Sequence, residues 1–430
     1  MICFRAIGII ALTVSLCQGC ADNSGDIRAD NAGSSINLTD LIMCPRVVLN
    51  EKSGLHNKHI TLFFSRKTGK PVEGIDLVIW SGFSDGLAAA QQNSDGGFGY
   101  VDTTGRVVIP FQYRHADGFS EGRAVAIPKD VDPSYAAGGV IDPNGRWIVE
   151  PGKYQGLIDR AGRWIVKPGT YYELGQYRDG RCPFRVGNKW GLMDGEGRVI
   201  VSPRYLLGGY AQPIFHSGFA AVRDETGQWV YIDKDGQVAF KAPHGTRRAL
   251  PFNDGRARIE VDVEREVPRE HVEGVDDTTY SVTEHKCGYV GMTGSVVIPP
   301  TYDAAGDFSE GLAPVSKHAR VPFQDDSDPM EFSFPSDEVD SWGYIDVTGK
   351  VVIPFGFERA GLFSGGLARV RKDGKWGYID RTGKLVIPYR YNWARDFRDG
   401  VAEVWTQGKI LFIDRTSKVV VDTNQEAVIF

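Results

Sequence analysis

Residues 375–388 read KWGYIDRTGKLVIP, and this string recurs along the chain with its order and spacing preserved. Residues 341–354 read SWGYIDVTGKVVIP, so Trp342 and Trp376 stand 34 residues apart. Self-similarity at a fixed period is the sequence signature of a repeat protein. The 430-residue chain is therefore predicted to contain many copies of one short unit rather than two or three unrelated domains.

Other copies of the string have drifted but keep an apolar run followed by a turn. They lie at 97–110, 140–145, 157–162, 190–197, 229–236, 287–294 and 411–417. A second segment recurs as well, because FSEG at 119–122 and 308–311 matches FRDG at 397–400 and FSDG at 83–86. At least eight copies thus fill the chain from about Phe83 to its end.

The string itself predicts strands joined by turns. Its Trp-Gly-Tyr-Ile run is aromatic and β-branched, as strands favour. In the Asp-x-x-Gly step, the Asp accepts bonds from nearby backbone N–H groups and the Gly takes a left-handed conformation. A second apolar run ends at Pro354 or Pro388, since proline lacks the N–H that a strand ladder needs. With a further strand over 400–404, one unit is about three short antiparallel strands.

The predicted fold class is all-β, a tandem array of short antiparallel hairpin or three-stranded repeats in an extended, twisted, solenoid-like stack. A lone three-stranded unit is marginal in water, so each unit must be covered by the next. We therefore expect Trp342, Tyr344, Trp376 and Tyr378 to be mainly buried between units. A closed β-propeller is the alternative, although its blades need four strands and a longer repeat.

The recurring string resembles the WG repeat family, named for its opening Trp-Gly pair, over roughly residues 83 to 421. The resemblance implies an all-β fold, frequent export and a role in interactions, and it brings no catalytic residue and no cofactor. The residues that define the repeat are Trp190, Gly191, Trp342, Gly343, Asp346, Gly349, Trp376, Gly377, Asp380 and Gly383.

The N-terminal residues predict export. Arg5 precedes an apolar run over 6–16 that is too short to span a bilayer, so residues 1–19 are interpreted as a signal peptide. Cys20 follows Gly19 as the lipidated Cys of a bacterial lipoprotein follows a small residue. Residues 20–44 are then a flexible linker, 45–82 an N-terminal β cap segment, and 83–430 the repeat array.

These features predict a protein of the bacterial cell envelope. We expect it to be lipid-anchored at the outer membrane and to face the periplasm or the exterior, with a soluble secreted or periplasmic protein as the alternative. The net charge of −6 argues against nucleic acid, which needs clustered positive charge. Contact with the membrane is predicted through the N-terminal lipid alone.

Two charged insertions break the period near 260–286 and 318–341. The second holds the weak metal candidates Asp325, Asp326 and Asp328, which lack the spacing of an ordered calcium loop, so a solvated acidic loop is the preferred interpretation. Three further Cys have no metal-ligand spacing, namely Cys44, Cys182 and Cys287. Cys182 and Cys287 are expected to be packed thiols, and a disulfide is the less favoured alternative.

The sequence favours binding over catalysis. Residues 118–122 and 82–86 match the Gly-x-Ser-x-Gly elbow of serine hydrolases, but Ser120 occupies the same position of the repeat as Arg398. We therefore predict a non-catalytic binding or scaffold protein whose partner is an unknown protein or an envelope glycan. The alternative is an envelope hydrolase with its site on repeat loops or within residues 45–82.

Overall fold

The chain is almost entirely β-structure. A computed structural model describes residues 38–49, 57–65, 67, 71–72, 77–92, 96–129, 140–141, 147–149, 155–206, 212–268, 279–320 and 338–426. In these residues one short 3-10 helix, η1 (Leu38–Asp40), accompanies strands that pair in small antiparallel sheets. The prediction of an all-β tandem array is confirmed.

Eight four-stranded units, here called blades A to H, follow one another along the chain. Strand β7 (Val107–Ala116) ends blade A and begins blade B, so these two blades share a seven-stranded sheet. The other strands of blades A and B are β4 (Val78–Ile79), β5 (Leu87–Gln91), β6 (Phe98–Asp102), β8 (Arg123–Pro128), β11 (Gly156–Asp159) and β12 (Trp164–Val166). Blades C and D contain β13 (Glu173–Leu174), β14 (Cys182–Val186), β15 (Lys189–Met193), β16 (Val199–Leu206), β17 (Ala220–Arg223), β18 (Trp229–Ile232) and β19 (Val238–Lys241).

Blades E to H each form a separate four-stranded sheet whose strands are in sequence order. Blades E and F contain β20 (Thr246–Asn253), β21 (Arg256–Pro268), β22 (Thr279–Gly291), β23 (Val296–Tyr302), β24 (Ala304–Ala305), β25 (Leu312–Arg320), β26 (Glu338–Asp346) and β27 (Val351–Phe357). Blades G and H contain β28 (Arg359–Ala360), β29 (Leu367–Lys372), β30 (Lys375–Asp380), β31 (Leu385–Tyr391), β32 (Trp393–Ala394), β33 (Val401–Thr406), β34 (Lys409–Asp414) and β35 (Val419–Glu426).

The unit therefore has a fourth strand beyond the three that the sequence predicts. The additional strand is the first of each blade, and in blades F, G and H it spans only two residues. A strand of two residues is too short to show the alternation of apolar and polar residues by which strands are predicted from a sequence. It is defined by pairing alone, for example of Ala394 with Val404 in β33.

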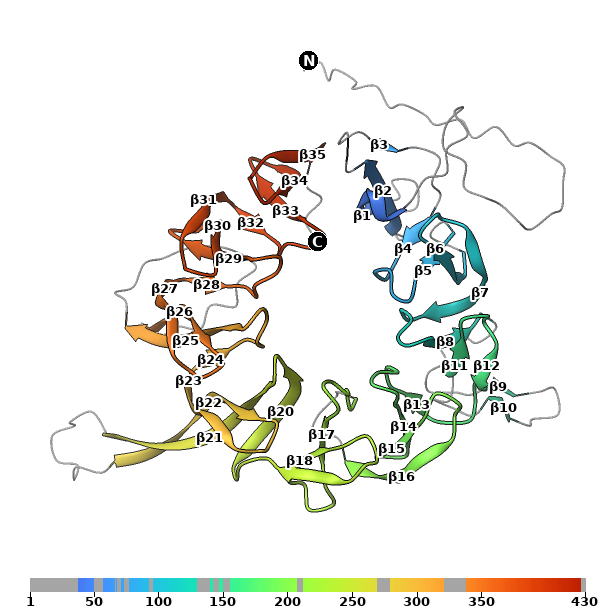
Figure 1. Cartoon of the computed structure of the whole chain (residues 1–430), viewed down its shortest axis with the longest axis horizontal. Coiled ribbons are helices and arrows are strands. Elements are labelled where there is room, and N and C mark those ends of the chain that lie inside the picture. The colour runs from blue at the N-terminus through green and yellow to red at the C-terminus, as the bar shows by residue number, and fades with distance from the viewer. Residues whose placement is uncertain are drawn as a thin grey trace, which may run out of the picture.

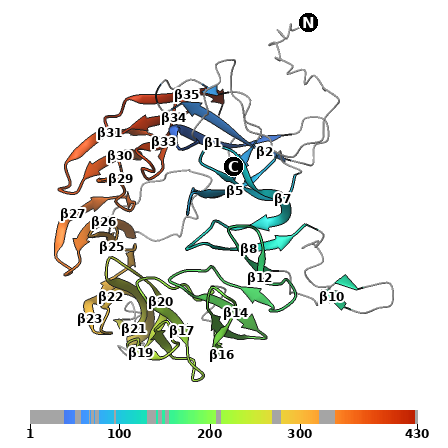
Figure 2. The same ribbon diagram turned by 45° about the vertical axis from the view of Figure 1, so that its right-hand side comes forward.

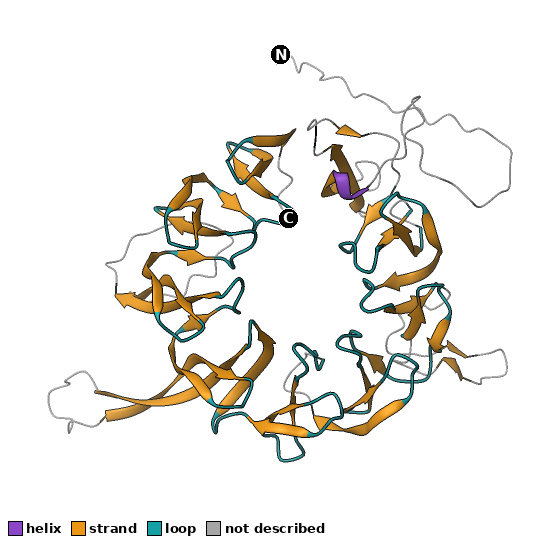
Figure 3. Cartoon of the chain, in the orientation of Figure 1, coloured by secondary structure: helices purple, strands orange, loops and turns teal. Residues whose placement is uncertain are grey.

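The blades lie side by side around a ring (Figure 1), with the first strand of each blade nearest the middle and the fourth at the outside. The turns between first and second strands project inward (Figure 3). The array thus bends round on itself instead of extending. This is the arrangement of the propeller alternative, whose requirement for four strands the blades meet.

An N-terminal sheet of β1 (Leu41–Leu49), β2 (Asn57–Ser65) and β3 (Pro71–Val72) lies where the two ends of the ring meet. Leu41 and Phe63 pack with Val101 of blade A, while Ile42 packs with Phe412 of blade H. Figures 1 and 2 both place β1 beside the last blade. The segment that does not fit the repeat therefore joins the last blade to the first.

A contact between a Tyr ring and a Phe ring recurs between neighbouring blades. The third-strand Tyr of one blade meets the Phe of the next blade edge-on, at 5.0 Å between ring centroids for Tyr344 and Phe363 and 4.8 Å for Tyr378 and Phe397. Each Tyr hydroxyl also donates to a backbone carbonyl of the next blade, that of Gly361 at 2.9 Å and that of Arg395 at 2.7 Å. Edge-to-face pairs add about 0.5–1.5 kcal/mol beyond burial, so each interface is stabilised independently.

The first insertion differs from a loop in its described part. Residues 260–268 and 279–286 continue β21 and β22 as one long antiparallel hairpin. Between β8 and β11 a separate hairpin of β9 (Val140–Ile141) and β10 (Trp147–Val149) lies outside the blades, although its sequence copies the repeat. Both insertions join the second and third strands of a blade.

Candidate functional site

The inward turns share one backbone geometry. In every blade two successive residues have positive φ, and the second is Gly. This is the type I′ arrangement, which suits the twist of a two-residue hairpin. The eight pairs are Asp85–Gly86, Glu121–Gly122, Asp179–Gly180, Ser217–Gly218, Asp254–Gly255, Glu310–Gly311, Gly365–Gly366 and Asp399–Gly400.

An acidic side chain at the first of these positions links one blade to the next. Glu310 of blade F accepts hydrogen bonds from the N–H groups of Gly365 at 2.6 Å and Gly366 at 2.9 Å in blade G. Asp85, Glu121, Asp179 and Asp254 bind the N–H groups of the following turn in the same way. Successive N–H groups in such a turn form a small anion-binding concavity. The inward turns are thus built to hold carboxylates.

Two blades lack this acid. Blade D has Ser217 in its place and blade G has Gly365, so the turns of blades E and H receive no carboxylate from the preceding blade. At Gly365 the guanidinium of Arg415 from blade H lies where a side chain would begin. The positive charge of Arg415 therefore lies beside the inner turn of blade G, in which glycine replaces the usual acidic residue.

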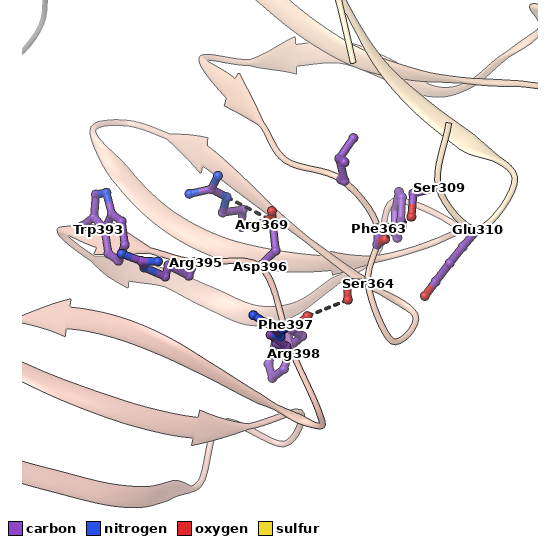
Figure 4. A pocket seen from close by; sticks show the side chains of 11 residues that line it. Ser309, Glu310, Phe363, Ser364, Arg369, Trp393, Arg395, Asp396, Phe397 and Arg398 are labelled. Atoms are coloured by element: carbon purple, nitrogen blue, oxygen red, sulfur yellow. Dashed lines mark hydrogen bonds and ion pairs between the residues drawn. The ribbon is translucent and has the colours of Figure 1, made fainter. Parts of the chain in front are cut away.

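A hollow of about 660 Å³ opens in the inner wall where blades F, G and H meet (Figure 4). Its size suits a small ligand. It is lined by Ser309, Glu310, Leu362, Phe363, Ser364, Arg369, Trp393, Arg395, Asp396, Phe397 and Arg398.

Trp393 and Arg395 line one side of this hollow, and both contact residues of strand β33. Trp393 is half-buried, and its ring lies 5.4 Å from that of Trp405. The Arg395 guanidinium lies 5.1 Å from the centre of the Trp393 ring, a cation–π contact. Glu403 accepts a bond from the Trp405 indole N–H at 3.1 Å and lies 3.7 Å from Arg395. These contacts fix the orientation of the aromatic surface.

On the other side, Asp396 and Arg369 form an ion pair of 2.9 Å between Oδ1 and Nε. Burial raises the pKa of Asp396 above its ordinary value, although the guanidinium of Arg369 opposes the shift. The hydroxyls of Ser309 and Ser364 donate to the backbone carbonyls of Phe363 and Phe397 in the next blade. Both serines are therefore engaged in blade-to-blade contacts.

The repeat is identified by comparison with known families. The family described as WG containing repeat matches residues 98–126, 156–190, 190–229, 288–318, 342–376 and 376–409. The chain belongs to the WG repeat family. A search of curated proteins found no significant match.

Solved structures resemble the WG repeat chain at low identity. The tricorn protease shares 12% identity with a TM-score of 0.25, and the comparison covers 90% of this chain and 39% of that one. BamB from Moraxella catarrhalis shares 11% identity with a TM-score of 0.31, over 90% of this chain and 97% of that one. An extracellular domain of the putative hybrid two-component system BT3049 from B. thetaiotaomicron shares 10% identity with a TM-score of 0.23, over 94% and 60%. At these TM-scores the likeness supports no inference about function.

The residues that define the WG repeat lie in third strands and the turns after them. Gly377 is required because a Cβ there would lie 2.6 Å from the carbonyl oxygen of Ile387 in β31. Asp380 accepts bonds from the Thr382 hydroxyl and N–H at 2.6 and 2.9 Å, and these bonds lower its pKa. The remaining copies place Trp190, Gly191, Trp342, Gly343, Asp346, Gly349, Trp376 and Gly383 at equivalent positions.

The expected burial of the opening aromatics holds for the tyrosines and only partly for the tryptophans. Tyr344 and Tyr378 are fully buried, whereas Trp342 and Trp376 are half-buried. Trp376 stands near the start of its strand, where the Arg369 guanidinium covers its ring at 5.1 Å. Trp190 is buried in the expected way.

Several predicted sites lie outside the described residues or form no cluster. Cys20 and the acidic group Asp325, Asp326 and Asp328 belong to segments that the structure does not describe. Among the described residues, no group of three His, Cys, Asp or Glu is placed to hold a metal ion. In the same residues no helix is long and apolar enough to cross a membrane. Cys182 and Cys287 are buried free thiols, and burial raises the pKa of both.

The residues of the hollow were missed by reasoning from the repeat, which searches for what the copies share. Trp393 stands where other copies carry different residues, whereas Arg369 and Asp396 recur as Arg258 and Asp307, which form an ion pair of 3.4 Å between blades E and F. The departures themselves are the signal that could have found them. Gly365 in place of an acid and Arg398 in place of a serine fall next to each other in space, and both are visible in an alignment of the copies.

Proposed function

We propose that this WG repeat protein is a non-catalytic binding scaffold of the bacterial cell envelope, which holds a glycan in the hollow of blades F to H. The observation that carries the proposal is the half-buried Trp393 beside fixed charged groups on the inner wall. An aromatic face packs against the C–H face of a sugar, while Arg and carboxylate groups match its hydroxyls. The predicted N-terminal lipid on Cys20 would tether the ring to the outer membrane.

The hollow favours a glycan over a peptide. An extended peptide binds a sheet by adding a strand to a free edge. The inner edge strands of blades F to H are two residues long, which is too short to guide an added strand. A protein partner would therefore have to bind elsewhere on the ring.

The groups of the hollow support binding rather than catalysis. The Ser309 and Ser364 hydroxyls donate to backbone carbonyls, so neither is paired with a base as a nucleophile must be. The Glu310 carboxylate is held by two backbone N–H groups. Each of these side chains already has a structural partner.

One observation favours the alternative of an envelope hydrolase. Asp396 has a raised pKa and shares the hollow with a second carboxylate, Glu310, and glycosidases use two carboxyl groups of which one acts as a general acid. Turnover of an envelope glycan by the purified protein, lost in Asp396→Asn, would establish this function in place of the scaffold.

The proposal is tested by binding of the purified protein to an array of envelope glycans. Trp393→Ala should weaken any observed binding by about tenfold or more, because it removes the aromatic face of the hollow. Tyr172→Ala is the matched control, since Tyr172 is 41% exposed, lies just before the first strand of blade C and does not line the hollow. Equal loss in both variants, or no glycan bound by the unchanged protein, would overturn the proposal.

A further inference from the structure

Gly365 and the turn that follows it in blade H point to a specific ligand group. We infer that the hollow binds the carboxylate of an acidic glycan, a uronic acid, at a slot made by Gly365, the N–H of Gly400 and the guanidinium group of Arg415. This inference rests on the proposed glycan-binding function and adds the chemical class of the sugar.

Equivalent turns elsewhere in the protein bind carboxylates of its own side chains. At the boundary of blades F and G the equivalent N–H groups hold the carboxylate of Glu310, and at the boundary of blades B and C they hold that of Glu121, at 2.8 Å from the N–H groups of both Asp179 and Gly180. The turn of blade H has the same backbone conformation, with φ of 80° at Gly400. An N–H concavity of this shape binds an anion wherever one is supplied.

Gly365 removes the carboxylate that the chain itself would supply. Since glycine has no side chain, blade G supplies no carboxylate to the Gly400 N–H. No carboxylate of another described residue accepts a hydrogen bond from this N–H either. A ligand carboxylate placed there would replace the missing side chain. Its route is open, because Phe397 and Arg398 of the same turn line the hollow.

The charge around the slot is left uncompensated. In blade G, Arg381 approaches to 3.5 Å of the Cβ position of Gly311, the turn that also carries Glu310. In blade H, Arg415 occupies the corresponding place, but the turn beside it carries Gly365 instead of an acid. Arg398 of the adjoining turn points its guanidinium toward blade A instead, to 2.5 Å from the Cβ position of Gly82. The guanidinium group of Arg415 can form a charge-assisted hydrogen bond with the carboxylate of a ligand.

The rest of the sugar would lie in the hollow. Its volume of about 660 Å³ suits a sugar unit or two rather than a bare anion. Trp393 and Asp396 line the same hollow as Arg398 of the turn that carries Gly400 (Figure 4), so they can contact the sugar ring and its hydroxyls.

The test restores the missing acid. In Gly365→Glu the new side chain should occupy the slot as Glu310 occupies its own, and Glu is already accommodated at this turn position at φ of 51° in Glu121 and 55° in Glu310. The three described atoms nearest to its Cβ all belong to the guanidinium group of Arg415, the far end of a long side chain that can shift. Ser217→Glu is the matched control, because blade D also lacks the acid but its boundary with blade E lies outside the hollow.

Calorimetry should use trigalacturonate, a glucuronate-containing hyaluronan oligosaccharide and oligomannuronate, each beside its carboxyl-reduced neutral form. We expect at least one acidic form to bind, its neutral form to bind about tenfold or more weakly, and Gly365→Glu to cause a similar loss that Ser217→Glu does not. Equal binding of the neutral form, or unchanged binding in Gly365→Glu, would overturn the carboxylate slot and leave glycan binding standing. Binding of polyglutamate in place of all three glycans would overturn the sugar assignment.

Discussion

The boundary between blades F and G and the boundary between blades G and H share their apolar contacts but differ at several polar positions, among them the Arg369–Asp396 ion pair found only in the second. Both have the buried Tyr–Phe contact and the Tyr hydroxyl bonded to the next blade. The first boundary adds Glu310, and it has Gly383 in the outer turn. The second has Gly365 in place of the acid and Ser417 in place of the outer glycine. The difference teaches that apolar contacts hold the ring together, while the polar positions of single boundaries are free to change.

The largest effect is expected at the outer turn. Gly383 has a φ of 85°, and a Cβ there would lie 3.1 Å from Ile353 of blade F. Gly383→Val should therefore lower the free energy of unfolding by about 3 kcal/mol, through left-handed strain and crowding together. Urea unfolding followed by tryptophan fluorescence measures the change.

Ser417 provides the comparison, because it takes the same turn position with φ of 69° and contacts the Tyr391 hydroxyl at 3.2 Å. Ser417→Gly should cost less than about 1 kcal/mol, since glycine relieves the left-handed strain while the hydroxyl contact is lost. A cost for Gly383→Val as small as that of Ser417→Gly would show that the two outer turns are not packed as described.

An intermediate effect is expected where the two boundaries are the same. Tyr344→Phe and Tyr378→Phe each remove one hydroxyl and leave a buried carbonyl, that of Gly361 or Arg395, without its partner. Each should lower the free energy of unfolding by about 1–2 kcal/mol. Because the rings remain, differences between the two variants report only on the hydroxyl contact, and values differing by more than about 1 kcal/mol would contradict the shared design.

The sequence predicts the parts of the blade whose order is local. Trp376 to Asp380 and the turn that ends at Gly383 are adjacent in the chain, so their strand and turn residues can be read directly. The first strand, Trp393–Ala394, is too short to show a period and exists only by pairing with β33. The curvature of the ring depends on the small rotation between packed blades, which no single residue encodes.

The candidate site was less predictable than the fold because it arises between blades. Arg369 belongs to blade G and Asp396 to blade H, and they meet only when the two blades pack. The repeat pattern also directs attention to shared residues, whereas Gly365 matters because it departs from them. The repeat position that Ser120 shares with Arg398 was readable, and in the structure Ser120 is followed by a two-residue turn and strand β8 rather than by a helix.

The smallest effect is expected for the acid that distinguishes the two boundaries. Glu310→Gln keeps the size of the side chain and removes the charge that two N–H groups of blade G share. The carboxylate is exposed, so water screens it and the loss should be about 0.5–1 kcal/mol. Glu225→Gln is the control, since Glu225 only approaches Lys189 at 3.8 Å and its change should be negligible. A loss at Glu310 as large as that of the Tyr hydroxyls would mean that the inner acids are required for the ring. The absence of an acid at Gly365 would then lower the stability of the boundary between blades G and H. Another contact would have to compensate for that loss in the protein without ligand.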